Sequence, residues 1–96
     1  MAEIRVTSAS LRAKKDELQQ MNAKFKDAVN KLQDTEKTLN SSWEGEAQKA
    51  FDSKFNNDKI QMDNFYNAVQ AYVTALDQII AQYEKTEATN VQIASK

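Results

Sequence analysis

The carboxylates are the side chains of this sequence that could take part in acid–base or metal chemistry. The 96 residues include 14 aspartates and glutamates, but no histidine and no cysteine. Without histidine the chain lacks the usual general base and the commonest metal ligand, and without cysteine it has neither disulfides nor thiolate zinc sites. Asp58 interrupts a helical stripe of apolar residues, but one carboxylate does not make an active site. We therefore expect no enzymatic activity, no metal and no cofactor.

Asp58 and the other carboxylates also have structural explanations. The register of a helical hairpin would place Asp58 opposite residues 25–29, where Lys26 could join it in a partly solvated ion pair. Five acidic residues of the first half are interspersed with lysines, as on a solvated helix face: Asp16, Glu17, Asp27, Asp34 and Glu36. We assign none of these five a ligand role.

Two other groups of residues could support recognition by a second protein. Trp43-Glu44-Gly45 lies near the middle of the chain and holds its only tryptophan and its only glycine. We expect Trp43 to cover the end of a hairpin, and Gly45 to let two helices approach closely where the chain turns. Further along, Tyr83 and Glu87 are four residues apart, so they share one face of a helix.

Two long helical patterns position these groups, and no proline interrupts either. In the first half an apolar residue recurs at every seventh position, which predicts a helix over about 8–40. The row consists of Leu11, Leu18, Phe25, Leu32 and Leu39. From Phe51 onward, apolar residues follow spacings of four and three, which predicts a second helix over about 44–86.

Short polar residues mark the ends of both helices. Thr7 or Ser8 can cap the first helix, while Ser41 and Glu44 match a capping box that would start the second. A turn of about 41–43 makes the two helices antiparallel neighbours. We therefore expect a single all-α domain over 1–96, folded as a helix-turn-helix hairpin, with a flexible tail over about 88–96.

The second helix carries more apolar surface than one neighbouring helix can cover. Tyr66, Val73 and Ile80 form an additional heptad-spaced row, which we predict to be a dimer interface. A hairpin of this size buries too little surface for comfortable stability by itself. Two hairpins that pair head-to-tail into a four-helix bundle would bury the row.

Charge and hydropathy exclude several partners. A net charge of -1 gives no electrostatic footprint for nucleic acid. The sequence has no uncharged apolar run long enough to span a bilayer, so we expect no stable membrane insertion. The first residues also lack the pattern of a cleaved signal peptide, which by itself would indicate a cytoplasmic protein.

The chain resembles the WXG family of small early-secretory-antigen-like proteins, and this changes the expected location. The resemblance rests on about a hundred residues, two helices, Trp43-Glu44-Gly45 in the turn, and the Tyr-x-x-x-Asp/Glu element from Tyr83 to Glu87. It implies secretion by a type VII system without a cleaved signal peptide. It also implies a homodimer or a heterodimer with a sister WXG protein, and recognition by an FtsK/SpoIIIE-type ATPase.

Helix length constrains how the two motifs could act together. Residues 43 and 83 are separated by about 60 Å of helix, so Trp43 and Tyr83 of one chain cannot touch. In a head-to-tail dimer, Trp43 of one protomer would approach Tyr83 and Glu87 of its partner. The sequence therefore predicts a composite export signal that exists only in the dimer.

The resemblance leaves the role after export open, between an effector and a core export partner for other substrates. A cytoplasmic helical coiled-coil adaptor would explain the same heptad rows without export. A membrane-active helical protein could use the row of Tyr66, Val73 and Ile80 on lipid, but the near-zero net charge argues against it.

Overall fold

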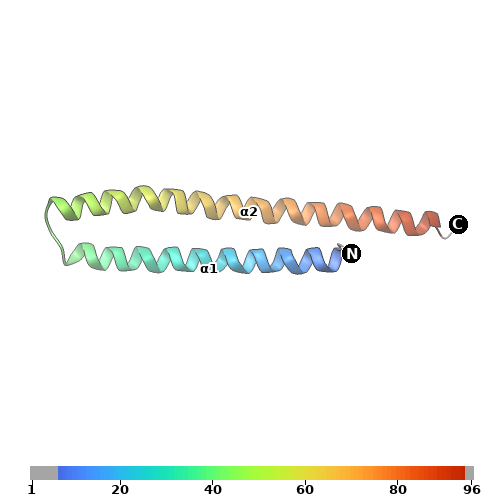
Figure 1. Cartoon of the computed structure of the whole chain (residues 1–96), viewed down its shortest axis with the longest axis horizontal. Coiled ribbons are helices and arrows are strands. Elements are labelled where there is room, and N and C mark those ends of the chain that lie inside the picture. Colours follow the sequence, from blue (N-terminus) through green and yellow to red (C-terminus); the bar gives the residue numbers. More distant parts are fainter. Residues whose placement is uncertain (1–6, 95–96) are drawn as a thin grey trace, which may run out of the picture.

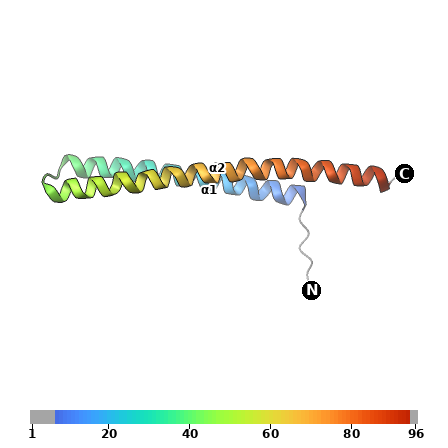
Figure 2. The same cartoon turned by 90° about the horizontal axis from the view of Figure 1, so that it is seen from above.

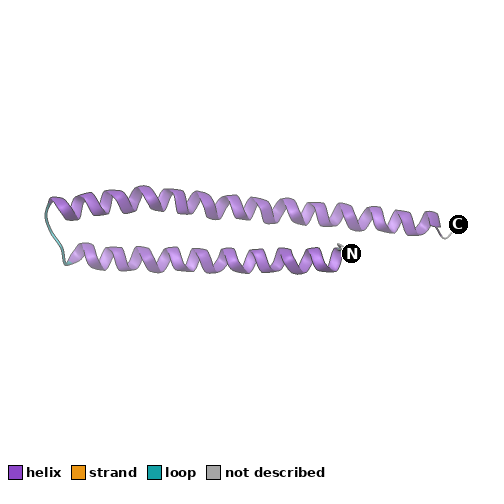
Figure 3. Ribbon diagram, in the orientation of Figure 1, coloured by secondary structure: helices purple, strands orange, loops and turns teal. Residues whose placement is uncertain are grey.

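The protein folds into two long helices that lie side by side in opposite directions (Figures 1 and 3). The computed structural model describes residues 7–94, and side chains as far as residue 90. Helix α1 spans Ser8–Ser41 and helix α2 spans Glu46–Ala94. The rod is 77 Å long, and the last part of α2 projects beyond the start of α1 (Figure 2). These features confirm the all-α antiparallel hairpin.

Thr7 caps the start of α1 through a reciprocal pair of hydrogen bonds. The Ser10 backbone N–H donates to Thr7 Oγ1 over 3.1 Å, and the Thr7 backbone N–H donates to Ser10 Oγ over 3.0 Å. Thr7 itself is extended, with φ -110° and ψ 160°, as an N-cap residue should be. Of the two predicted cap residues, Thr7 is therefore the one that acts.

The turn differs from the predicted one. Ser41 still belongs to α1, where its hydroxyl donates to the Thr38 carbonyl over 2.7 Å. Helix α2 begins only at Glu46, so the predicted capping box of Ser41 and Glu44 is wrong. At its other end α2 continues to Ala94, past the predicted end near 86.

Gly45 has a different purpose from the close helix approach that the sequence suggested. A Cβ atom on Gly45 would meet no atom within 4 Å, so no neighbour requires the missing side chain. Its φ angle of 112° is in the region that side chains disfavour, which explains why glycine suits this position. Gly45 sets the direction in which the chain enters α2.

The line of α1 that faces α2 is partly polar. Its buried residues are Asn22, Val29 and Glu36, each seven positions after the last. The buried residues of α2, as far as residue 90, are Phe55, Val69, Val73 and Ile80. The apolar row that predicted α1 flanks this seam instead of filling it. Leu32 and Leu39 are 47% and 42% exposed, because the helix presents the neighbouring row to its partner.

Specific contacts fix the register of the two helices. The Asn22 side chain donates to the Tyr66 carbonyl and to Gln70 Oε1, both over 3.1 Å. Because Asn22 is buried, these hydrogen bonds are needed to offset the loss of water. Toward the open end, Lys15 forms an ion pair with Asp77 over 3.2 Å. Each of these contacts joins α1 to α2.

Candidate functional site

Trp43 lies in the turn, where its ring is half-buried. The ring packs against Phe51 in the first turns of α2, with 5.9 Å between centroids and a tilt of 51°. Phe51 remains 41% exposed despite this contact. The pair therefore forms an aromatic surface at the end of the rod where the chain reverses.

Tyr83 and Glu87 are joined by a hydrogen bond on α2. The Tyr83 hydroxyl donates to Glu87 Oε1 over 3.2 Å, so the two side chains share a helix face as the spacing predicts. Partial burial raises the pKa of Tyr83, and the Glu87 charge raises it further. The neighbouring Glu84 bonds Arg12 in the first turns of α1. Tyr83 therefore lies at the level where α1 starts.

The two motifs lie far apart along the rod. Trp43 precedes the start of α2 at Glu46, and Tyr83 comes late in that helix. The two ends of α2 lie at opposite ends of the rod (Figure 1). About 1.5 Å of helix rise per residue keeps them apart within one protomer. One copy of the chain therefore cannot bring the motifs together.

The row that we expected to form the dimer interface faces inward. Ile80 has no exposed surface and Val73 is only 9% exposed, because α1 packs over both. Tyr66 is half-buried, with the Lys26 ammonium 4.5 Å from the centre of its ring. The predicted interface is therefore wrong, since the hairpin itself covers this row.

The neighbouring apolar row of α2 is exposed instead. Phe51, Phe65, Tyr72 and Ile79 expose between 41% and 64% of their surface at heptad-related positions. The Phe65 ring contacts half-buried Phe25 of α1 edge-on, at 5.3 Å between centroids, so this exposed row adjoins α1 at that point. We define the exposed apolar face as Met21, Leu32, Leu39, Phe51, Phe65, Tyr72 and Ile79. Between the helices it contains an apolar groove of about 320 Å³, lined in part by Met21 and Phe65.

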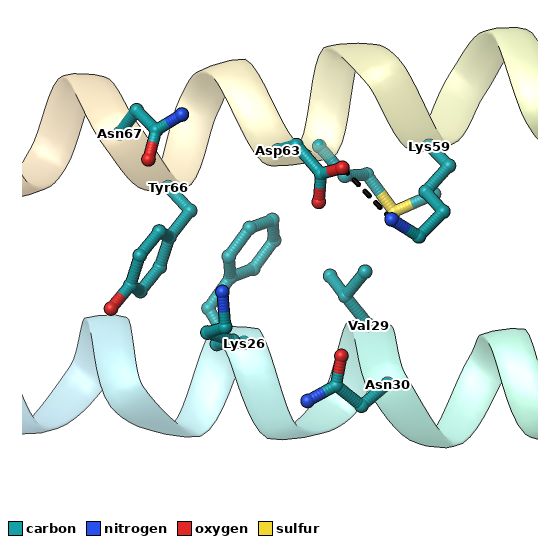
Figure 4. A pocket seen from close by; sticks show the side chains of 9 residues that line it. Lys26, Val29, Asn30, Lys59, Asp63, Tyr66 and Asn67 are labelled. Carbon is teal, nitrogen blue, oxygen red and sulfur yellow. Dashed lines mark hydrogen bonds and ion pairs between the residues drawn. The ribbon is translucent and has the colours of Figure 1, made fainter.

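A polar groove of about 260 Å³ lies between the two helices at mid-rod (Figure 4). Lys26 and Asn30 of α1 extend toward it, and Lys59 pairs with Asp63 over 2.8 Å along α2. Asp58 does not join Lys26 as predicted, since it pairs with Lys54 one turn before it, over 3.1 Å. Lys26 contacts the Tyr66 ring, so that predicted ion pair is wrong.

Sequence reasoning missed a buried polar cluster near the turn. Glu36, expected on a solvated face, is only 6% exposed and lies against Asp52 of α2. Asn40 and Gln48 complete the cluster. The seven-residue spacing of Glu36 from Val29 and Asn22 could have indicated this position, because all three are on one line of α1.

Among the described residues there is no candidate metal site and no candidate membrane span. Over 7–94, no cluster of three or more acidic, histidine or cysteine side chains could hold a metal ion. Neither helix, in its described part, is long and apolar enough to cross a membrane.

Comparison with known proteins gave one family. The family model WXG100, described as proteins of 100 residues with WXG, matches residues 3–88. No curated protein and no solved structure matched the chain significantly. The matched segment covers most of the chain and includes both Trp43-Glu44-Gly45 and the Tyr83–Glu87 pair.

Proposed function

Because this chain belongs to the WXG100 family, we propose that it is a non-enzymatic protein exported by a type VII secretion system. The family is associated with type VII secretion substrates. The family match over both motifs is the observation that carries the proposal. Outside the cell the protein acts through protein contacts, either as a virulence or competition effector or as a core export partner for other substrates.

The exposed apolar face is where a second WXG chain binds, either another copy of this protein or a sister protein. Four large apolar side chains on α2 and three on α1 are at least 41% exposed in the hairpin. Side chains of this size stabilise strongly when they leave water, so an unpaired hairpin would carry a costly surface. Head-to-tail pairing of two such faces gives the four-helix bundle.

Head-to-tail pairing would also complete the export signal. The turn of each protomer would lie beside the open end of its partner, which brings Trp43 to the other chain's Tyr83 and Glu87. An FtsK/SpoIIIE-type ATPase would then recognise an aromatic anchor and a carboxylate on α2 near the open end of the hairpin, supported by the partner's turn. The dependence on two chains restricts export to the assembled dimer.

The export signal is tested with variants of Tyr83 in a host that has an active type VII system. Tyr83→Ala removes the anchor, and we expect it to lower the exported fraction about tenfold or more. Tyr83→Phe keeps the ring but loses the hydrogen bond to Glu87, so it separates the two contributions. Lys85→Ala is the matched control, because Lys85 is an exposed neighbour on the same helix.

Circular dichroism and sedimentation must show that each variant still folds and associates. Accumulation of folded Tyr83→Ala inside cells, with normal export of Lys85→Ala, supports the proposed signal. Export of Tyr83→Ala at the wild-type level contradicts it. Retention of every form, wild type included, favours the cytoplasmic coiled-coil adaptor, which would use the same exposed apolar face without leaving the cell.

A further inference from the structure

Two carboxyl groups meet inside the hairpin close to its turn. Glu36 of α1 is 6% exposed, and its side chain lies within hydrogen-bonding reach of half-buried Asp52 of α2. Glu36 Oε1 is buried and has no hydrogen-bond donor. An ionised carboxylate in that position would be buried, unsatisfied and next to a second negative charge, which is an expensive arrangement.

The surrounding amides donate hydrogen bonds to Asp52. Asn40 Nδ2 donates to Asp52 Oδ1 over 2.7 Å, and Asn56 Nδ2 donates to Asp52 Oδ2 over 3.4 Å. The orientation of Asn40 is fixed in turn, because its own Oδ1 accepts a hydrogen bond from Gln48. Both oxygens of Asp52 thus accept hydrogen bonds, whereas Glu36 Oε1 has no partner.

The charged neighbours do not supply a cation that would neutralise the pair. On α1, Lys37 follows Glu36 in sequence and its charge acts to lower the pKa of Glu36, but this effect is the smallest of those on the group. On α2, Asp52 is the charged residue that acts on Glu36. The lysines on either side of Asp52 pair elsewhere: Lys49 with Glu46, Lys54 with Asp58, and Lys59 with Asp63.

We propose that Glu36 and Asp52 hold one proton between them, and that this proton-binding site fastens the turn end of the hairpin in acid and loosens it at higher pH. The proton resides on Glu36, whose hydroxyl donates to ionised Asp52. One proton thereby gives the buried glutamate a hydrogen-bond partner and removes the repulsion between two anions. This proposal is independent of the proposed export, because it concerns only the protonation of Glu36 and Asp52.

The direction of the pH effect follows from the pKa of Glu36. Its hydrogen bond with Asp52, its burial and the Asp52 charge all raise this pKa above the ordinary value of 4.5. Between that value and the raised one, the folded chain binds more protons than the unfolded chain, so stability falls as pH rises. The contribution is complete below about pH 4.5 and is lost as pH rises through the folded-state pKa of Glu36.

The position of the site connects it with the turn. Asn40 and Gln48 belong to the last turn of α1 and the first turns of α2, and both are half-buried. They lie on either side of Trp43 in sequence, so a looser Glu36–Asp52 contact would free the segment that holds the tryptophan. Trp43 fluorescence therefore serves as a local probe of the same protonation.

The test is the thermal unfolding of the full chain between about pH 4 and pH 8. We expect the wild-type midpoint to fall with rising pH, and Glu36→Gln, whose amide can donate permanently to Asp52, to be more stable than wild type by about 5 °C at the upper end. Asp34→Asn is the matched control, since this exposed carboxyl two positions away should leave the pH slope unchanged. A wild-type slope retained in Glu36→Gln overturns the proposal.

Two further measurements keep the test decisive. Carbon-13 NMR titration of the wild-type carboxyls needs no variant, and a Glu36 pKa at or below the ordinary 4.5 would contradict the shared proton. A cation bound between Glu36 and Asp52 is the alternative to the shared proton. Thermal unfolding at neutral pH, first with calcium and then with a chelator, tests this alternative. A calcium-dependent rise in the wild-type midpoint that Glu36→Gln abolishes would make this a cation site and overturn the proposal.

Discussion

Neighbouring residues on α2 have opposite surroundings, although both of their rows are apolar and both repeat every seven residues. Ile80 is fully buried against α1, whereas Ile79 is 59% exposed, and Val73 and Tyr72 differ in the same way at 9% and 64%. One row holds the hairpin together, and the other is the row that we propose contacts a second molecule. Each adjacent pair is therefore a matched comparison between folding and association.

The largest expected effect separates Ile80 from Ile79. Ile80→Ala removes a fully buried side chain and leaves a cavity, so it should lower the free energy of unfolding by about 2–5 kcal/mol. Ile79→Ala should have a much smaller effect on a single hairpin, because its side chain is largely in water. Urea unfolding at low protein concentration measures both.

High protein concentration should narrow the difference between the two variants if the exposed row is an interface. Under those conditions Ile79→Ala should weaken association, and its unfolding midpoint should lose part of the dependence on concentration that the wild type shows. Equal losses in Ile79→Ala and Ile80→Ala at every concentration would contradict the division into an inner and an outer row.

The next largest effect concerns the centre of the exposed apolar face. Tyr72→Ser removes the most exposed large side chain of the face, and we expect it to weaken association by about 2 kcal/mol or more, as for an interface hot spot. Equilibrium sedimentation gives the dissociation constant. Ile60→Ser is the control, because Ile60 is 57% exposed but does not belong to the exposed apolar face. Equal weakening by both variants would count against this face as the interface.

The smallest expected effect is a loss of hairpin stability from a substitution in the turn, which sets the direction of α2 relative to α1. Gly45→Ala forces a side chain onto a φ of 112°, and should destabilise the hairpin by about 1 kcal/mol although no neighbouring atom would clash. Chemical unfolding measures the loss, with Glu44→Ala as the exposed neighbouring control. A neutral or stabilising Gly45→Ala would show that the turn relaxes freely and does not fix the direction of α2.

The hairpin could be predicted from the sequence because residues close together in the chain determine its helices and its turn. Proline-free heptad spacing predicts two helices, and short polar residues around Trp43 predict the turn between them. The sequence predicts too early an end for α2, because the small polar residues after Glu87 favour a flexible tail. In the structure the helix continues to Ala94.

The inner row could not be chosen from periodicity, because two adjacent rows of α2 are equally apolar. Which row of α2 is buried depends on the line of α1 that packs against it. That line includes polar Asn22 and Glu36, so in the sequence it looks like a solvent-exposed face. Their partners lie far away in sequence, on α2, and only the folded register brings them together. The Glu36–Asp52 site was missed for the same reason.

Export itself is the central claim, and its most direct test uses the unmodified chain. The measurement is the amount of protein in culture supernatant and in cells, in a type VII host with and without a functional secretion ATPase, with a cytoplasmic marker to exclude lysis. We predict that the protein is in the supernatant only when the ATPase is active. The same distribution in both strains would contradict the account.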